Sequence, residues 1–367
     1  MNILLFIIVL GVLVFVHELG HFLFAKLFNI RVDEFGFGYP PKMFKMFRWK
    51  GTDFTMNWIP FGGFVKIFGE ADDGEELSEE DKQVSLVHKP RWQQFLVMFG
   101  GILFNVIFAW ILFSAIYMSG VTAPIESAPD NYSFEETRLV VSGVMQDSPA
   151  DLARLIPGDE VKELFNDTGE QITITNETIT EVSEFINLQG ELGGDVGFIV
   201  LRNDDQLEII EISPEEGLIE GKYGVGIGLE RVGELQLPFH QALVYGAKNT
   251  WNFTVAITQG FGQLITGQIS ADNVSGPVGI VKQIGDASAV GISYLIGFTA
   301  LLSLNLAVLN LIPFPALDGG RILIILIESI IGRRLNPNIV NWVNVIGFFI
   351  LIALMLLVTA NDIIKLF

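Results

Sequence analysis

The chain of 367 residues contains no cysteine. No disulfide can therefore stabilise it, and no thiolate can bind a metal or act as a nucleophile. Basic residues are scarce between residues 118 and 240, where 25 Asp or Glu stand against 6 Lys or Arg. This segment holds nearly all of the net charge of −20, and such an acidic surface argues against nucleic acid and anionic lipid headgroups as partners.

The N-terminal apolar run lacks the marks of a removable signal peptide. No basic residue precedes it, and no small-residue cleavage site follows it. We therefore expect this run to remain as the first membrane span. The chain also shows no repeated span pattern, which disfavours a transporter with a His/Glu proton relay.

Apolar residues make up half of the chain and the mean hydropathy is positive, as in integral membrane proteins. Four apolar runs are long enough to cross a bilayer: residues 3–28, 92–118, 291–312 and 341–360. The predicted fold is a polytopic α-helical membrane protein with four transmembrane helices, a membrane-associated β-hairpin and an inserted α+β PDZ-like domain.

The first apolar run carries the sequence His17-Glu18-Leu19-Gly20-His21. Residues four apart lie on one face of a helix, so both histidines could bind one zinc ion, with Glu18 beside it as general base. The alternative is that the histidines only hydrogen-bond neighbouring helices. A charged group in a span costs roughly 2.5 to 3.5 kcal/mol of insertion free energy, which favours a functional interpretation.

A third zinc ligand is expected in the stretch from Asn310 to Gly320, which follows the third span. Pro313 and Pro315 stop regular helix there, and irregular backbone at membrane depth must be buried in protein or line a cavity. Asp318 is the best carboxylate available as third ligand. As an alternative, Asp318 could cap a helix that starts near Gly319 or Gly320.

Basic residues predict the topology. Residues 31–91 carry nine Lys or Arg, and Arg333 and Arg334 precede the fourth span, so both connections should be cytoplasmic. The metal site would then lie toward the cytoplasmic side. The acidic segment between the second and third spans would lie on the other side of the membrane.

The cytoplasmic loop is expected to contain a hairpin of two short strands, Gly51–Pro60 and Phe61–Phe68, joined at a Pro-Phe-Gly-Gly turn. An exposed strand edge there could bind an unwound substrate through main-chain hydrogen bonds. The alternative is a hairpin that only packs against lipid or helices.

The predicted organisation has three parts. Residues 1–118 and 236–367 form the two halves of a membrane core, and residues 119–235 form an extracytoplasmic domain. Within that domain, residues 136–213 resemble a PDZ domain, which binds extended peptides by strand addition. The motifs that carry this resemblance are Ser148-Pro-Ala and Pro157-Gly-Asp-Glu-Val161.

Three shorter features complete the expectations. Gly100, Gly101 and Asn105 interrupt the second span, where small residues allow close helix approach and an Asn can hydrogen-bond toward the site. Residues 240–268 suit a helix lying at the membrane interface. The stretch Ser275-Gly-Pro-Val-Gly-Ile280 is expected to form a tight backbone turn.

Taken in order along the chain, these motifs resemble the bacterial intramembrane site-2 proteases, the zinc proteases that cut anti-sigma factors and signal-peptide remnants. The resemblance implies one Zn²⁺ per chain at His17, His21 and Asp318, with Glu18 as the catalytic acid/base. It also implies a set of substrate-binding residues, namely Asn310, Pro313, Pro315, Asn105, Gly63, Phe64 and Val65. Well-known relatives carry two tandem PDZ domains, whereas one is visible here.

The expected activity is zinc-dependent hydrolysis within the transmembrane segments of single-span proteins, in the bacterial cytoplasmic (inner) membrane. The expected partners are these substrates, the lipid bilayer and a peptide or substrate ectodomain at the PDZ-like domain. The alternative is a catalytically inactive scaffold or chaperone that binds peptides through the PDZ-like domain.

Overall fold

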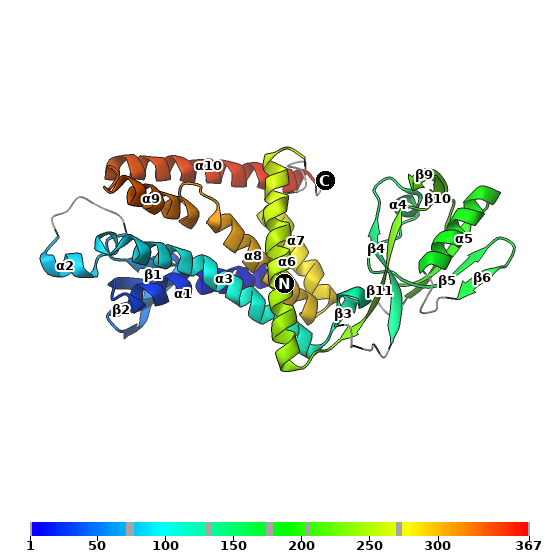
Figure 1. Cartoon of the computed structure of the whole chain (residues 1–367), viewed down its shortest axis with the longest axis horizontal. Coiled ribbons are helices and arrows are strands. Elements are labelled where there is room, and N and C mark those ends of the chain that lie inside the picture. Colours follow the sequence, from blue (N-terminus) through cyan, green and yellow to red (C-terminus); the bar gives the residue numbers. More distant parts are fainter. Residues whose placement is uncertain are drawn as a thin grey trace. The chain divides into compact units, whose positions relative to one another are not determined.

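The computed structural model describes residues 2–70, 77–129, 132, 134, 136–173, 179–202, 206–219, 221–268 and 274–365. The chain forms two compact units. The membrane unit joins Met1–Met118 to Pro238–Phe367, and the inserted unit is Ser119–Leu237. Figure 1 labels the elements of both.

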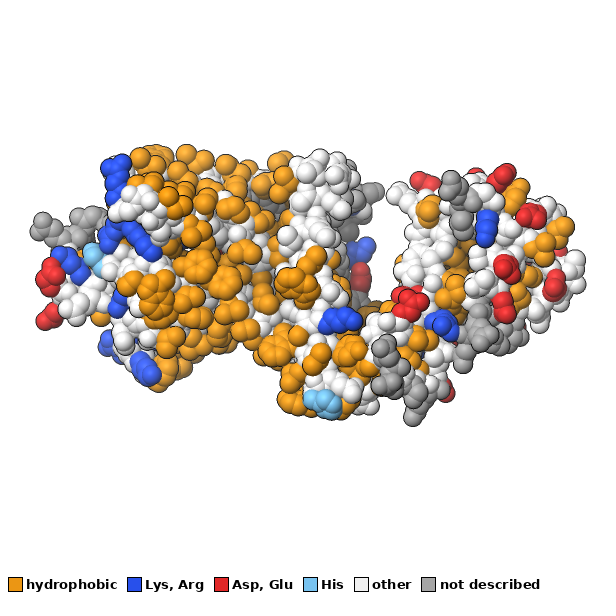
Figure 2. Space-filling model, in the orientation of Figure 1, with side chains coloured by type: hydrophobic (Ala, Val, Ile, Leu, Met, Phe, Trp, Pro, Cys, Tyr) orange, Lys and Arg blue, Asp and Glu red, His pale blue; other side chains and the backbone are white. Residues whose placement is uncertain are grey.

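Four helices of the membrane unit are long and apolar enough to cross a bilayer: α1 (Asn2–Leu27), α3 (Arg91–Ser119), α8 (Ile292–Leu311) and α10 (Pro337–Ile364). Their bounds lie close to the four predicted spans, so this prediction is confirmed. Most of their side chains face outward, and hydrophobic groups cover much of the visible surface of these helices (Figure 2). Such a surface is stable in lipid rather than in water.

The hairpin prediction is wrong about the position of the turn. The two strands are β1 (Val32–Trp49) and β2 (Thr52–Ile67), and the turn lies at Lys50 and Gly51, whose φ angles are 45° and 82°. Glycine favours this left-handed backbone, so the turn forms there rather than at Pro-Phe-Gly-Gly, which lies inside β2.

The β1 and β2 strands are long and bend back on each other. Residues 34–37 of β1 pair both with residues 53–56 and with residues 63–66 of β2. Gly38 and Gly62 have φ angles of 78° and 76°, which places left-handed backbone inside each strand. The result is a small folded sheet that contacts α1.

The other helices of this unit are α2 (Glu79–Val84), the short η1 (Leu86–His88), α6 (Phe239–Ile265), α7 (Pro277–Val290) and α9 (Asp318–Ile331). The α6 helix agrees with the helix expected over 240–268 and runs across α3 and α10 in Figure 1. Its location at the interface stays a prediction. The tight turn expected over 275–280 is wrong, because Pro277 starts the α7 helix there.

The inserted unit contains one main β-sheet, a second small sheet and three short helices among its described residues. Its main sheet has the order β3-β11-β4-β5-β7-β8, with β6 paired to β5, and β9 pairs with β10. The bounds are β3 (Val121–Pro124), β4 (Thr137–Val144), β5 (Glu160–Asn166), β6 (Gln171–Thr173), β7 (Val196–Arg202), β8 (Gln206–Ile212), β9 (Glu215–Ile219), β10 (Lys222–Gly224) and β11 (Ile227–Leu235), with η2 (Ile125–Ser127), α4 (Pro149–Leu152) and α5 (Ile179–Leu192).

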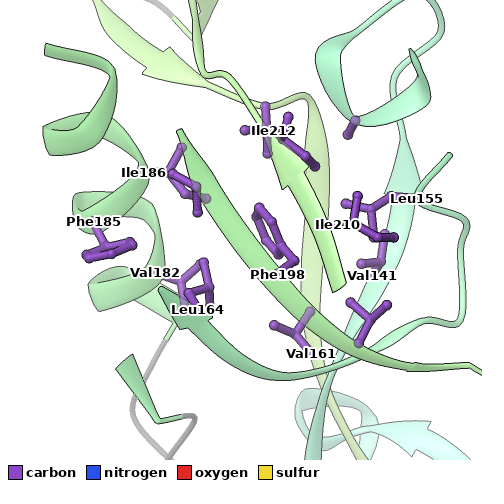
Figure 3. Packing of buried hydrophobic residues seen from close by; sticks show 14 of the residues in the cluster. Val141, Leu155, Val161, Leu164, Val182, Phe185, Ile186, Phe198, Ile210 and Ile212 are labelled. Atoms are coloured by element: carbon purple, nitrogen blue, oxygen red, sulfur yellow. The ribbon is translucent and has the colours of Figure 1, made fainter. Parts of the chain in front are cut away.

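One hydrophobic core holds the inserted unit together. Val182, Phe185 and Ile186 of α5 face Leu164 of β5 and Phe198 of β7 (Figure 3). This is an α+β unit, as the sequence predicts, and its likeness to a PDZ domain stays a prediction.

Candidate metal centre

The α1 helix brings His17 and His21 to one buried face, with Glu18 next to them. Their neighbour is α3, which approaches closely because both helices have glycine at the crossing. A Cβ at Gly20 would lie 2.2 Å from the backbone oxygen of Gly100. The small residues of the second span therefore set the spacing of the two helices.

Asp318 reaches the histidines from the first turn of α9. The α8 helix ends at Leu311, and the chain turns through the segment 312–317 before α9 starts. Two glycines make this tight return possible. A Cβ at Gly319 would lie 2.3 Å from the Ile312 oxygen, and one at Gly320 would lie 2.2 Å from the Phe314 oxygen.

The three side chains converge on one point. Asp318 Oδ2 lies 3.0 Å from His17 Nε2 and 3.3 Å from His21 Nε2, and the two nitrogens are 3.2 Å apart. Ligands held roughly 2.0–2.1 Å from a tetrahedral zinc are about 3.3 Å from one another. Asp318 Oδ2 is buried and accepts no hydrogen bond of good geometry. The cluster therefore fits a cation that receives one lone pair from each residue.

The Asp318 side chain does not cap the α9 helix, so the alternative role suggested by the sequence is not seen. The N-cap of α9 is Leu317, which makes no side-chain capping bond, and the Asp318 carboxylate points to the histidines. In the described ranges of the chain, this is the one group of three His, Asp or Glu residues close enough to share a metal ion.

Both histidines are oriented through their other ring nitrogen. His21 Nδ1 lies 2.8 Å from the Val97 backbone oxygen, so it donates and leaves Nε2 as the lone-pair atom. His17 Nδ1 lies 3.1 Å from the Asn105 amide nitrogen. The Asn105 oxygen is buried without a partner. Turning the amide by 180° lets this oxygen accept the His17 Nδ1 proton and satisfies both groups.

Gly101 gives the two histidine rings their room. A Cβ there would lie 2.5 Å from His21 Nε2 and 2.8 Å from His17 Cε1. Any larger residue would displace the histidine rings. The sequence signal for this role was the Gly-Gly pair in an otherwise bulky span, but its partner could not be named before the packing of α1 on α3 was known.

Glu18 lies between the cluster and the β2 strand. It interacts electrostatically with His21 and Asp318, and its carboxylate accepts a hydrogen bond from the backbone N–H of Val65. Residues 63–66 of β2 pair with β1 along one edge. Within the described residues, the edge of β2 that faces Glu18 has no strand partner.

A cavity of about 1110 Å³ opens beside Asp318. Its lining is rich in polar and charged side chains, among them Lys66, Arg321, Asn341 and Asn344. Arg321 also donates to the Glu70 backbone oxygen at 2.7 Å. This cavity gives water a path to the cluster through an otherwise apolar region.

The remaining candidate residues fall into two groups. Asn310, Pro313 and Pro315 lie on the last turn of α8 and on the loop before Asp318, whereas Gly63, Phe64 and Val65 lie in β2. Asn105 is fully buried and lies against His17, and its contact with a substrate stays a prediction. Sequence reasoning did not identify the Val97 oxygen, because a backbone acceptor leaves no mark in the sequence.

Comparisons with known proteins agree along the whole chain. The family model described as Peptidase family M50 matches residues 5–354. A putative zinc metalloprotease of Clostridium perfringens is 36% identical, with 99% of each chain covered. The regulator of sigma-W protease RasP of Bacillus subtilis is 29% identical, covering 100% of this chain and 99% of its own. The probable protease eep of Enterococcus faecalis is 30% identical with the same coverage.

Proposed function

The chain belongs to peptidase family M50 and is a multi-pass membrane zinc metalloprotease of the site-2 type, and we propose that it cleaves single-span proteins within their transmembrane segments. The observation that carries the proposal is the convergence of His17, His21 and Asp318 beside Glu18, on helices that suit a membrane. The relative named as a regulator of sigma-W supports a role in sigma-factor regulation. The substrate classes that we propose, anti-sigma factors and signal-peptide remnants, are those that the family resemblance implies.

We assign zinc to His17 Nε2, His21 Nε2 and an Asp318 carboxylate oxygen. When bound, zinc lowers the pKa of a coordinated water to about 7 and polarises a carbonyl group. We propose that Glu18 takes a proton from the attacking water and returns it to the leaving amine. Asn105 holds His17 in the tautomer that presents Nε2, and so acts through the ligand rather than on the substrate.

The open edge of β2 is the proposed receiving surface for the substrate. Amides of a transmembrane helix are hydrogen-bonded within the helix, so the segment must unwind before hydrolysis. An unwound segment can pair with residues 63–67 as an added strand, next to Glu18. We propose that Asn310, Pro313 and Pro315 bind the other side of the substrate, as the family resemblance implies.

The proposed topology puts the cleavage chemistry in the cytoplasmic half of the bacterial inner membrane and residues 119–237 outside. The basic residues of the 31–91 segment and of the α9–α10 connection support it. The inserted unit is proposed to act as a PDZ-like filter for substrate ectodomains. We disfavour a catalytically inactive scaffold, because His17, His21 and Asp318 converge and Glu18 lies beside His17 on α1.

Metal removal tests the activity itself. Purified protein in liposomes should cut a single-span reporter inside its apolar segment, as mapped by mass spectrometry of the two fragments. A chelator should abolish the cut, and added zinc should restore it, because ligand-bound zinc supplies the Lewis acid. A reporter that is bound but never cut, with zinc present at about one ion per chain, would favour the scaffold alternative.

The edge-strand proposal is tested by removing one amide. Val65→Pro removes the N–H that reaches Glu18 and also prevents regular strand pairing at this edge, so the cleavage rate should fall at least about fivefold, the equivalent of one main-chain bond of about 1 kcal/mol. Val65→Ala keeps the N–H and is the matched control. Because the chain has no cysteine, a single Lys66→Cys can be crosslinked to a cysteine in the reporter. Unchanged crosslinking with proline at 65 would contradict the proposal, because loss of the Glu18 hydrogen bond alone would lower cleavage without displacing the substrate from β2.

A further inference from the structure

The motif from Ser275 to Gly279 has no part in the chemistry above, yet its backbone binds a buried side chain. Pro277 is the first residue of α7, and Gly276 is the N-cap. The first amides of a helix have no partner within the helix and need an acceptor from elsewhere. Gly276 and Gly279 both find that acceptor in Asp362, 86 and 83 residues away on α10.

The geometry is that of a carboxylate held by the positive end of a helix. Gly276 N–H donates to Asp362 Oδ1 at 3.1 Å, and Gly279 N–H donates to Oδ2 at 2.8 Å. Asp362 is 6% exposed. Hydrogen bonds to an ionised acceptor are roughly twice as strong as neutral ones, and the α7 dipole adds to them. We call this contact the Asp362 clasp.

The two glycines are required for the clasp. A Cβ at Gly276 would lie 2.8 Å from Asp362 Oδ2 and 3.0 Å from Val358 Cγ1. A Cβ at Gly279 would lie 3.3 Å from both carboxylate oxygens and 3.1 Å from Ser275 Cβ. Glycine at these two positions lets α10 approach until the carboxylate meets the amides.

Another contact of α10 is with the loop that precedes Asp318. A Cβ at Gly347 would lie 2.5 Å from Pro315 Cβ, so helix and loop touch there. Asn344 Oδ1 accepts a hydrogen bond from the Ala316 N–H at 3.3 Å. From Gly347 to Asp362, the helix spans about 22 Å. One rigid helix therefore connects the clasp to the segment that precedes the third metal ligand.

Few other contacts hold α10 against the protein. Only 6% of its apolar window is buried, against 22% to 39% for the other three spans. Burial of apolar surface therefore contributes little to its position. The two charge-assisted bonds to Asp362 therefore hold one end of this helix.

We propose that Asp362 is a positioning residue of the protease: it fixes α10 through α7 and thereby keeps Asn344 and Gly347 against the loop that presents Asp318. The inference rests on the proposed function for its effect on cleavage, but the coupling itself is a property of the fold.

Hydrogen exchange tests the coupling without any substrate. In liposomes, Asp362→Ala should speed exchange at least about tenfold in peptides covering 276–279 and also in peptides covering 314–318. Asp286→Ala removes an exposed carboxylate from the same α7 helix and should change neither. Faster exchange at 276–279 with unchanged exchange at 314–318 would overturn the proposal, whether or not a substrate has been found.

Cleavage provides the second test. Asp362→Ala should lower kcat between about tenfold and 100-fold, since small displacements of catalytic groups carry such costs. Asp362→Asn, which keeps one acceptor oxygen, should recover part of the loss. Gly279→Ala should weaken the same clasp from its other side, and the double variant should be no worse than Asp362→Ala alone. Full additivity of the two effects would overturn the proposal.

Discussion

Replacing Glu18 with Gln is expected to lower cleavage of a transmembrane reporter by at least about 10³-fold, within the range of 10² to 10⁴ for general acid–base catalysis. The amide has the shape of the carboxylate and can still accept the Val65 N–H, but it cannot take a proton from water. Zinc content should remain at about one ion per chain, because Glu18 is not one of the three converging ligands.

A matched control for this experiment is Glu79→Gln. Glu79 is an exposed residue of α2 that pairs with Lys82, and the same loss of one negative charge there should leave cleavage unchanged. Glu18→Gln protein that cleaved at the wild-type rate would contradict the assignment of the base. The same variant should accumulate its uncut substrates in cells, which identifies them by mass spectrometry.

The parts of the fold that were predicted correctly depend on composition over long windows. Four apolar runs of about 20 residues or more can only be accommodated as spans, so their helices follow from length and hydropathy. The spacing of His17 and His21 fixes a shared helical face in the same way. The structure places Asp318 with them, and its binding of zinc stays a prediction.

The parts that were not predicted depend on which of several glycines forms a turn. Gly51, Gly62 and Gly63 all lie within one apolar and aromatic stretch, and each is compatible with a hairpin turn. Pairing of residues 42–49 with residues 52–57 places the turn at Lys50 and Gly51. Residues 63–66 pair instead with the more distant residues 34–37, and that match is not visible locally. The same holds for Ser275–Gly279, where the acceptor that allows a helix to start is Asp362, far along the chain.

Loss of a metal ligand should have the second large effect. Asp318→Asn is expected to weaken zinc binding at least about 100-fold, since roughly 10 kcal/mol shared by three ligands gives about 3 kcal/mol for each. The amide oxygen is a poorer donor than the carboxylate, and the site also loses the negative charge that two neutral histidines need beside a dication. Zinc per chain, measured after dialysis against a weak chelator, should fall to near zero together with cleavage.

Asn105→Ala gives this experiment a graded comparison. Removing the group that orients His17 should weaken zinc binding between about 10-fold and 100-fold, less than the loss of a ligand, because the Nε2 donor remains. Asn105→Asp should keep an acceptor for the His17 Nδ1 proton and retain more zinc than the alanine variant. If Asn105 instead bound substrate, both variants would hold zinc as tightly as the wild type and only the KM for the reporter would rise. Equal loss of zinc affinity in Asp318→Asn and Asn105→Ala would also contradict the proposal that Asp318 binds zinc while Asn105 only orients His17. A residue that acts through His17 should lower zinc affinity less than a ligand does.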